Sequence, residues 1–259
     1  MNIIVCIKRV PQTAEAEVKV DPSGKNIIKD RLTFDTNESD TYALEEAILL
    51  KERCGAGSTV TAVSVGNADA EDSLRIALAK GADTAILVKA EDFGELDGFK
   101  TAQLLRAVIK DLPHDIILTG CVATDDGYYQ VGPVLAELLG IPHATLVTKV
   151  EVAGNKAQVH RELEGGLIEH LEATLPVLVT TQTGINEPRY ASLIAIRRAA
   201  SKEIKIVGNA ELGGYELLDN STLDSLFTPP VGKRAEILTG AADEVAAKVT
   251  GIIKDKGLI

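Results

Sequence analysis

The residues best suited to chemistry form one glycine-containing stretch, Gly120-Cys-Val-Ala-Thr-Asp-Asp-Gly-Tyr-Tyr-Gln-Val-Gly132, directly before a predicted helix. Gly120 and Gly127 permit close approach of a ligand to the backbone, and Gly132 permits close packing of the helix. The amides from about Gly127 to Gly132 would form the positive start of that helix, which attracts a phosphate. Oriented N–H groups supply the field, so no lysine is required. The stretch predicts a phosphate site, and a plain strand–loop–helix turn is the alternative interpretation.

Other side chains show no pattern typical of catalysis or metal binding. Cys6, Cys54 and Cys121 are widely spaced, and the four histidines also lack ligand spacing. There is no serine–histidine–aspartate arrangement and no Gly-x-Gly-x-x-Gly fingerprint after the first predicted strand. The sequence therefore predicts neither catalytic residues nor a metal. Chemistry would come from a bound cofactor that the protein positions.

Composition excludes several classes of function. The 259 residues are 45% hydrophobic and 25% charged, as in a soluble globular protein. The net charge of −11 disfavours nucleic-acid binding. No apolar run approaches the ~20 residues that span a bilayer, which predicts no direct membrane insertion. The start, Met1–Ile7, is typical of a first strand rather than a signal peptide, so we expect a cytoplasmic protein.

Strand and helix patterns alternate along the first part of the chain. This alternation predicts an α/β fold with a mainly parallel, doubly wound sheet of the Rossmann-like or flavodoxin-like nucleotide-binding kind. The predicted strands are Asn2–Ile7, Thr59–Val65, Thr84–Val88 and Asp115–Thr119. The predicted helices are Tyr42–Arg53, Ala70–Ala79, Thr101–Ile109 and Val131–Leu139. Ligands are expected where such strands end and the strand order reverses.

The pattern changes after Thr145. Val147–Val152 and Ala157–Leu163 predict an antiparallel hairpin, and Val177–Thr181 predicts a return to the core. Residues 207–239 are sparse in apolar side chains, and a helix is predicted over Ala241–Lys254. We therefore divide the chain into a nucleotide-binding domain, residues 1–206, and a C-terminal arm, residues 207–259, that packs on another subunit. A surface loop wrapping its own domain is the alternative interpretation of the arm.

The stretch from Val159 to Ala200 combines an acidic hairpin at Glu164-Gly165-Gly166, a buried strand, Asn186-Glu-Pro-Arg-Tyr190 and a basic tract. This pattern resembles the electron transfer flavoprotein β subunit, and the resemblance extends over almost the whole chain. It implies an obligate heterodimer with an α subunit and an FAD shared with that subunit. It further implies electron transfer from acyl-CoA dehydrogenase-type flavoenzymes to a downstream acceptor.

The resemblance also assigns residues to a nucleotide site. In the family, the loop before the helix carries an acidic cluster followed by Gln-x-Gly and binds a nucleotide. The residues at matching or adjoining places here are Cys6, Lys8, Asn37, Val65, Gly66, Gly120, Ala123, Asp125, Asp126, Gly127, Tyr128, Tyr129, Gln130, Val131 and Gly132. Two of them have other interpretations: Asn37 as a helix cap, although Ser39 and Asp40 are better placed, and Cys6 as a buried core thiol.

The nucleotide at that site is either AMP or a second FAD. Simple carriers in the family hold AMP there, whereas electron-bifurcating members hold a second FAD that accepts electrons from NADH. Val10-Pro11-Gln12-Thr13 is close to the form common in bacterial and bifurcating members. Tyr128 and Tyr129 depart from the small residues usual in bifurcating members, and their rings could obstruct the longer cofactor. On balance we expect AMP.

The resemblance places partner recognition near residues 184–203, called here the recognition segment. Leu193 matches the residue that anchors the carrier in an apolar pocket of its dehydrogenase, although single exposed leucines are often without significance. Arg189 has two possible uses, a salt bridge that fixes the segment or a subunit contact. The full set of expected partner-binding residues is Glu162, Arg189, Tyr190, Leu193, Ile196 and Arg197. For Glu162 and Arg197 a solvated surface is the alternative.

A stand-alone nucleotide-binding stress-type protein of similar α/β topology is the remaining alternative. It predicts a stable homodimer without flavin. It would leave both the arm and Leu193 without a purpose.

Overall fold

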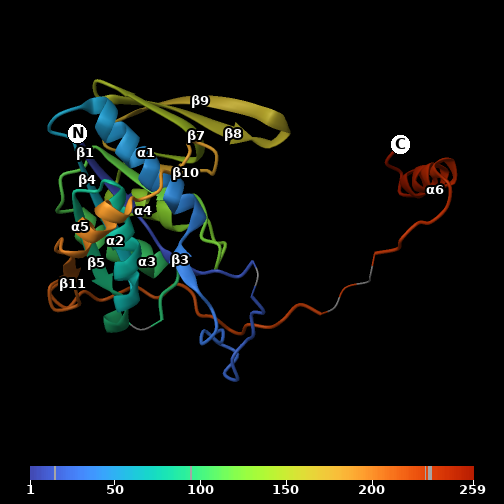
Figure 1. Cartoon of the computed structure of the whole chain (residues 1–259), viewed down its shortest axis with the longest axis horizontal. Coiled ribbons are helices and arrows are strands. Elements are labelled where there is room, and N and C mark those ends of the chain that lie inside the picture. Colours follow the sequence, from blue (N-terminus) through green and yellow to red (C-terminus); the bar gives the residue numbers. More distant parts are fainter. Residues whose placement is uncertain (15, 94, 231, 233–234) are drawn as a thin grey trace.

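A nine-stranded, mainly parallel sheet organises the chain in the computed structural model (Figure 1). The structure describes residues 1–14, 16–93, 95–230, 232 and 235–259. The strand order is β11-β5-β4-β1-β6-β10-β7-β8-β9. The parallel strands are β1 (Asn2–Cys6), β4 (Thr59–Gly66), β5 (Thr84–Lys89), β6 (Ile116–Gly120), β10 (Val177–Thr181) and β11 (Lys205–Val207).

One end of the sheet is antiparallel. β7 (His143–Ala153) pairs in parallel with β10 and antiparallel with β8 (Lys156–Leu163), which in turn pairs with β9 (Leu167–Thr174). These strands project beyond the helical layers (Figure 1). A separate two-stranded ribbon joins β2 (Arg9–Pro11) to β3 (Phe34–Thr36).

Helices cover both faces of the sheet because the buried strands alternate their side chains between two cores. Ile3 and Val5 of β1 belong to one core, whereas Ile4 and Cys6 belong to the other. The first core is closed by α1 (Glu38–Cys54), α2 (Glu71–Lys80) and α5 (Leu193–Ala200). The second is closed by α3 (Gly98–Ile109) and α4 (Val131–Leu139). One-turn 3-10 helices lie at Ala68–Ala70, Ala90–Phe93 and Glu164–Gly166.

The strand order reverses between β1 and β6. From β1 the chain adds β4 and then β5 on one side, and it returns to place β6 on the other side. The loops that follow β1 and β6 therefore diverge. The region at the carboxyl ends of these two strands, called here the crevice, is where ligands bind in folds of this kind. The sequence analysis predicted a ligand at this point of the sheet.

The predicted fold class is confirmed, and every predicted strand and helix is present. Sequence reasoning missed β2, β3, β9, β11 and α5. Three of these strands have three residues each, too few to show a period. In β9 the adjacent Leu167 and Ile168, both exposed, break the apolar–polar alternation. β7 begins earlier than predicted because its first residues pair with β10.

The C-terminal residues divide into two parts. Leu212, Tyr215 and Leu217 pack against the second core, and Gln103 exchanges two hydrogen bonds of 3.0 and 3.1 Å with the Leu218 backbone. Residues 212–218 therefore lie against their own domain, as the alternative interpretation of the arm predicts. In contrast, α6 (Ala242–Asp255) lies apart from the body (Figure 1) and has no buried residue.

None of the helices in the described ranges has the length and apolarity needed to cross a membrane.

Gly132, in the first turn of α4, gives a test of the packing between this helix and the sheet. A Cβ added there would lie 2.4 Å from Thr180 Cγ2 and 2.9 Å from Thr119 Oγ1. We expect Gly132→Ala to lower the free energy of unfolding by about 1–3 kcal/mol through overpacking, measured by urea denaturation. Gly251→Ala, in α6 with nothing within 4 Å, is the matched control and should not weaken the core. Equal stability of the two variants would contradict this account of α4 packing.

Candidate functional site

A buried carboxylate, Asp40 in the first turn of α1, joins the two strands at the crevice. Its Oδ2 accepts a hydrogen bond from the Lys8 backbone N–H at 2.7 Å, and its Oδ1 accepts one from the Gly120 N–H at 3.0 Å. Lys8 follows β1, and Gly120 ends β6. One side chain therefore fixes the ends of two neighbouring strands.

Gly120 is required by this close approach. A Cβ at position 120 would lie 2.2 Å from Asp40 Oδ1 and 2.4 Å from Ser39 Oγ. Any side chain would separate α1 from β6. The close backbone approach that the sequence predicted at Gly120 is thus made by the start of α1.

Burial sets the protonation of this cluster. Desolvation raises the pKa of Asp40 from 3.8 to about 7, although the Lys8 and Gly120 N–H donors and the Asn37 amide oppose the rise. Burial, and then the Asp40 charge, raise the pKa of the Cys6 thiol well above its usual range. Cys6 is buried and packs in the second core, as its alternative interpretation as a core thiol expects.

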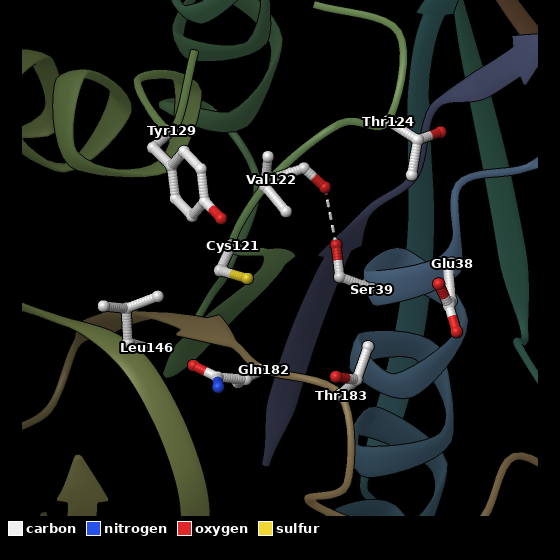
Figure 2. Close-up of a pocket in the computed structure, with 9 residues that line it drawn as sticks. All are labelled: Glu38, Ser39, Cys121, Val122, Thr124, Tyr129, Leu146, Gln182 and Thr183. Carbon is white, nitrogen blue, oxygen red and sulfur yellow. Dashed lines mark hydrogen bonds between the residues drawn. The ribbon is translucent and has the colours of Figure 1, made fainter. Parts of the chain in front are cut away.

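Asn37 binds the β6–α4 loop rather than capping its helix. It occupies the N-cap position of α1, yet its side chain makes no cap hydrogen bond. Its Nδ2 donates to the Val122 carbonyl at 2.8 Å, and its Oδ1 accepts from the Thr124 N–H at 3.1 Å. Ser39 Oγ donates to the same Val122 carbonyl at 2.7 Å (Figure 2). The start of α1 thus holds the loop backbone.

Lys8 holds the acidic part of the same loop. Its Nζ contacts Asp125 Oδ1 at 2.6 Å and Asp126 Oδ2 at 2.7 Å. Burial alone would lower the pKa of the Lys8 ammonium, but the two carboxylates outweigh burial and raise that pKa. The pairing offsets part of the negative charge that would otherwise repel a phosphate.

The loop enters α4 with its first amides available. Gln130 is the N-cap, and its side chain makes no cap hydrogen bond. First-turn amides, here including Val131 and Gly132, have no intrahelical acceptor. Gly127 (φ 65°) and Tyr129 (φ 57°) adopt left-handed backbone, which is unusual for a tyrosine. These features fit a phosphate held by backbone N–H groups.

Beside the loop lies a cavity of about 170 Å³ (Figure 2). Tyr129 and Cys121 line one side of it, and burial raises the pKa of the Cys121 thiol. The complete lining is Glu38, Ser39, Cys121, Val122, Thr124, Tyr129, Leu146, Gln182 and Thr183. Its walls come from the start of α1 and the ends of β6 and β10, with Leu146 of β7 opposite.

The structure gathers most of the predicted nucleotide-site residues but not all. Lys8, Asn37 and the loop from Gly120 to Gly132 meet at the crevice. Val65 and Gly66 end β4, on the far side of β1, and they do not line the described cavity. Gly66 instead permits a tight turn, since a Cβ there would lie 2.7 Å from that of Ala70.

Sequence reasoning missed the cavity wall formed by Leu146, Gln182 and Thr183. It considered Ser39 and Asp40 only as helix caps. The available signal was the position of Gln182 and Thr183 directly after a predicted buried strand, at the same edge of the sheet as Gly120.

The recognition segment contains a helix. Leu193 is the first residue of α5, and the preceding Ser192 caps it by accepting the Ala195 N–H at 3.2 Å. The recognition segment is therefore helical over Leu193–Ala200, a helix that the sequence analysis did not predict because it has only two turns. Tyr190 is 98% exposed and Leu193 77% exposed, and Ile196 and Arg197 are exposed as well.

Arg189 and Glu162 lie in different surroundings. Arg189 contacts Glu45 and Glu52 of α1, which is the first of its two expected uses, a salt bridge that fixes the segment. Glu162 is exposed on β8 opposite Ile168 of β9.

No group of three or more histidine, cysteine or acidic residues in the described parts of the chain could hold a metal ion.

Residues 26–212 match the family model described as the electron transfer flavoprotein domain. The chain is 39% identical over 265 residues to the electron transfer flavoprotein subunit beta of Bacillus subtilis, with 100% of both chains covered. It is 34% identical over 267 residues to the caffeyl-CoA reductase-Etf complex subunit CarD of Acetobacterium woodii, again with 100% of both covered. It is 36% identical to protein FixA of Azotobacter vinelandii, covering 92% of this chain and 88% of that one.

The raised pKa of Asp40 predicts a pH dependence of stability. Between pH 3.8 and about 7 the folded state retains a proton that the unfolded state has lost, so stability rises as pH falls through this window. Above about pH 7 the Asp40 carboxyl no longer changes the free energy of unfolding with pH. We expect Asp40→Asn to remove this contribution in urea unfolding measured across the pH series. Parallel profiles for wild type and variant would contradict the assignment.

Proposed function

Because the chain belongs to the electron transfer flavoprotein β-subunit family, we propose that it works in an obligate heterodimer with an α subunit and shuttles electrons from acyl-CoA dehydrogenase-type flavoenzymes. In this proposal it binds AMP structurally and helps to hold an FAD carried mainly by the α subunit. It acts as a carrier in the cytoplasm, where its three free cysteines suit a reducing compartment.

The observation that carries the proposal is the loop at the strand-order reversal. Asn37, Ser39 and Lys8 hold its backbone and its acidic side chains, while the uncapped amides at the start of α4 face no intrahelical acceptor. This arrangement suits a phosphate held for structure by backbone N–H groups. Val131 and Gly132 would hold the phosphate, and the neighbouring cavity would receive the rest of the nucleotide.

The flavin, when bound, supplies the redox chemistry by accepting and releasing electrons. This chain contributes surface rather than reacting groups. Its projecting β8–β9 hairpin carries Glu162, which we assign to an ion pair with the flavin-bearing part of the α subunit. Helix α6, lying apart from the body with no buried residue, is assigned to the α subunit as well.

A second candidate is a bifurcating complex in which the same crevice holds the adenylate half of a second FAD that accepts electrons from NADH. The exposed face of residues 124–130 favours it, since a longer cofactor could continue there. The Tyr129 ring beside Cys121 in the cavity favours AMP. Family membership gives no support to a stand-alone stress-type protein.

Nucleotide release separates these candidates. The α–β complex is purified, denatured, and its FAD and AMP are quantified per heterodimer. We expect one FAD and one AMP. Two FAD without AMP would establish the bifurcating candidate. Release of no FAD and no AMP would contradict both candidates.

Leu193→Ala tests the assignment of the recognition segment. Truncating an exposed leucine that anchors a partner should raise the KM of the complex for an acyl-CoA dehydrogenase reduced by its acyl-CoA by about 10-fold or more, from the loss of roughly 2 kcal/mol of apolar burial. Ile28→Ala, which truncates another exposed residue, is the control. An unchanged KM for the Leu193 variant would show that the dehydrogenase docks elsewhere.

A further inference from the structure

Two adjacent glutamates of α1, Glu45 and Glu46, are each only 3% exposed. Buried carboxylates are costly unless they are paired and hydrogen-bonded. Glu45 pairs with Arg189 of the recognition segment. Glu46 forms an ion pair with Arg53 of α1 itself and accepts a hydrogen bond from Asn186 of the segment. The acidic face of α1 is therefore built against this segment.

Arg189 makes the densest set of these contacts. Its Nε donates to both carboxylate oxygens of Glu45, at 2.9 and 3.1 Å, and its backbone N–H donates to Glu45 Oε2 at 2.9 Å. The other edge of the guanidinium binds Glu52 bidentately, at 2.7 and 3.1 Å. Bonds to Glu52 and then Glu45 outweigh the effect of burial and raise the pKa of Arg189. Glu45 thus holds both the backbone and the side chain of one residue.

Further contacts fix the segment on either side of Arg189. Asn186 Nδ2 donates to the Tyr42 carbonyl and to Glu46 Oε2, each at 3.1 Å. At the far end, Arg75 of α2 donates to the carbonyls of Ala199, Ala200 and Lys202, each at 3.2 Å. The exposed Leu193 and Ile194 lie between these two anchored ends.

We propose that Glu45 is a positioning residue for partner docking, which locks residues 186–192 to α1 through Arg189 so that Leu193 is presented before the partner arrives. The inference rests on the proposed function. Its physical basis is that a segment that is already ordered loses less conformational entropy when it binds. The Glu45 carboxylate is buried, and a buried charge that loses its partner is costly, so the pairing with Arg189 restricts where the segment can lie.

The test uses the full α–β complex carrying Glu45→Gln, which keeps the shape of the side chain and removes its charge. A purified acyl-CoA dehydrogenase reduced by butyryl-CoA serves as the donor. We expect the KM for the complex to rise about 10-fold while kcat changes less than about twofold, because binding alone is impaired. Hydrogen exchange of the Arg189 amide, which donates to Glu45 Oε2, should accelerate by a similar factor, and the nucleotide content should stay unchanged.

Further variants serve as comparisons. Glu151→Gln removes an exposed ion pair to Lys149 on β7 and should leave both readouts unchanged. Arg189→Lys keeps the positive charge but loses the bidentate guanidinium hydrogen bonds, and it should give an intermediate KM. This variant replaces Glu45→Gln in the test if Glu45→Gln fails to fold. The double variant Glu45→Gln with Arg189→Gln should be no worse than Arg189→Gln alone, because that single variant already lacks the contact with Glu45.

An unchanged KM and unchanged exchange in Glu45→Gln would overturn the positioning role. Faster exchange with an unchanged KM would overturn it too, because the pair would then be structural only. The Leu193→Ala variant separates this failure from that of the proposed function. If Leu193→Ala raises the KM and Glu45→Gln does not, only the role of Glu45 fails; if neither raises it, docking through this segment fails as well.

Discussion

The crevice depends on one interaction, the acceptance of two backbone N–H groups by the buried Asp40 carboxylate. These donors, at Lys8 and Gly120, belong to the ends of adjacent strands whose following loops diverge. Burying a carboxylate is costly, and that cost is visible in its pKa of about 7. The interaction persists because Gly120 lets α1 approach β6 closely enough for the carboxylate to reach both donors. The loop that we assign to the nucleotide phosphate is positioned by this contact.

Helix α1 serves both candidate sites. Its start holds the β6–α4 loop through Asn37 and Ser39. Its middle holds the recognition segment through Glu45 and Glu46. Because a helix is stiff over this length, the nucleotide loop and the exposed Leu193 have a fixed relation to one another. A single element thus sets the relative positions of the candidate nucleotide loop and the segment that we propose for docking.

The sequence was sufficient for the parallel sheet because short apolar or alternating runs predict its core strands, and helical periods separate these runs along the first part of the chain. It was also sufficient for the loop from Gly120 to Gly132, which combines glycines with a helix start. It was insufficient for contacts between residues distant in sequence. Nothing local indicates that Asn37 turns away from its own helix to bind Val122, or that Glu45 faces Arg189. Polar residues on a helix are ordinarily solvent-exposed, and only the packed fold shows that these are buried.

The buried polar contacts have a common physical logic. Asp40 and Glu45 each hold backbone N–H groups of a segment distant in sequence, so both carboxylates position the chain. Apolar packing alone would stabilise α1 at least as well, but apolar contacts are non-directional and tolerate several arrangements. Hydrogen bonds from Asp40 and Glu45 permit few arrangements, because an unpaired buried carboxylate is costly. The energetic cost of burying charge is therefore what makes the geometry of both regions specific.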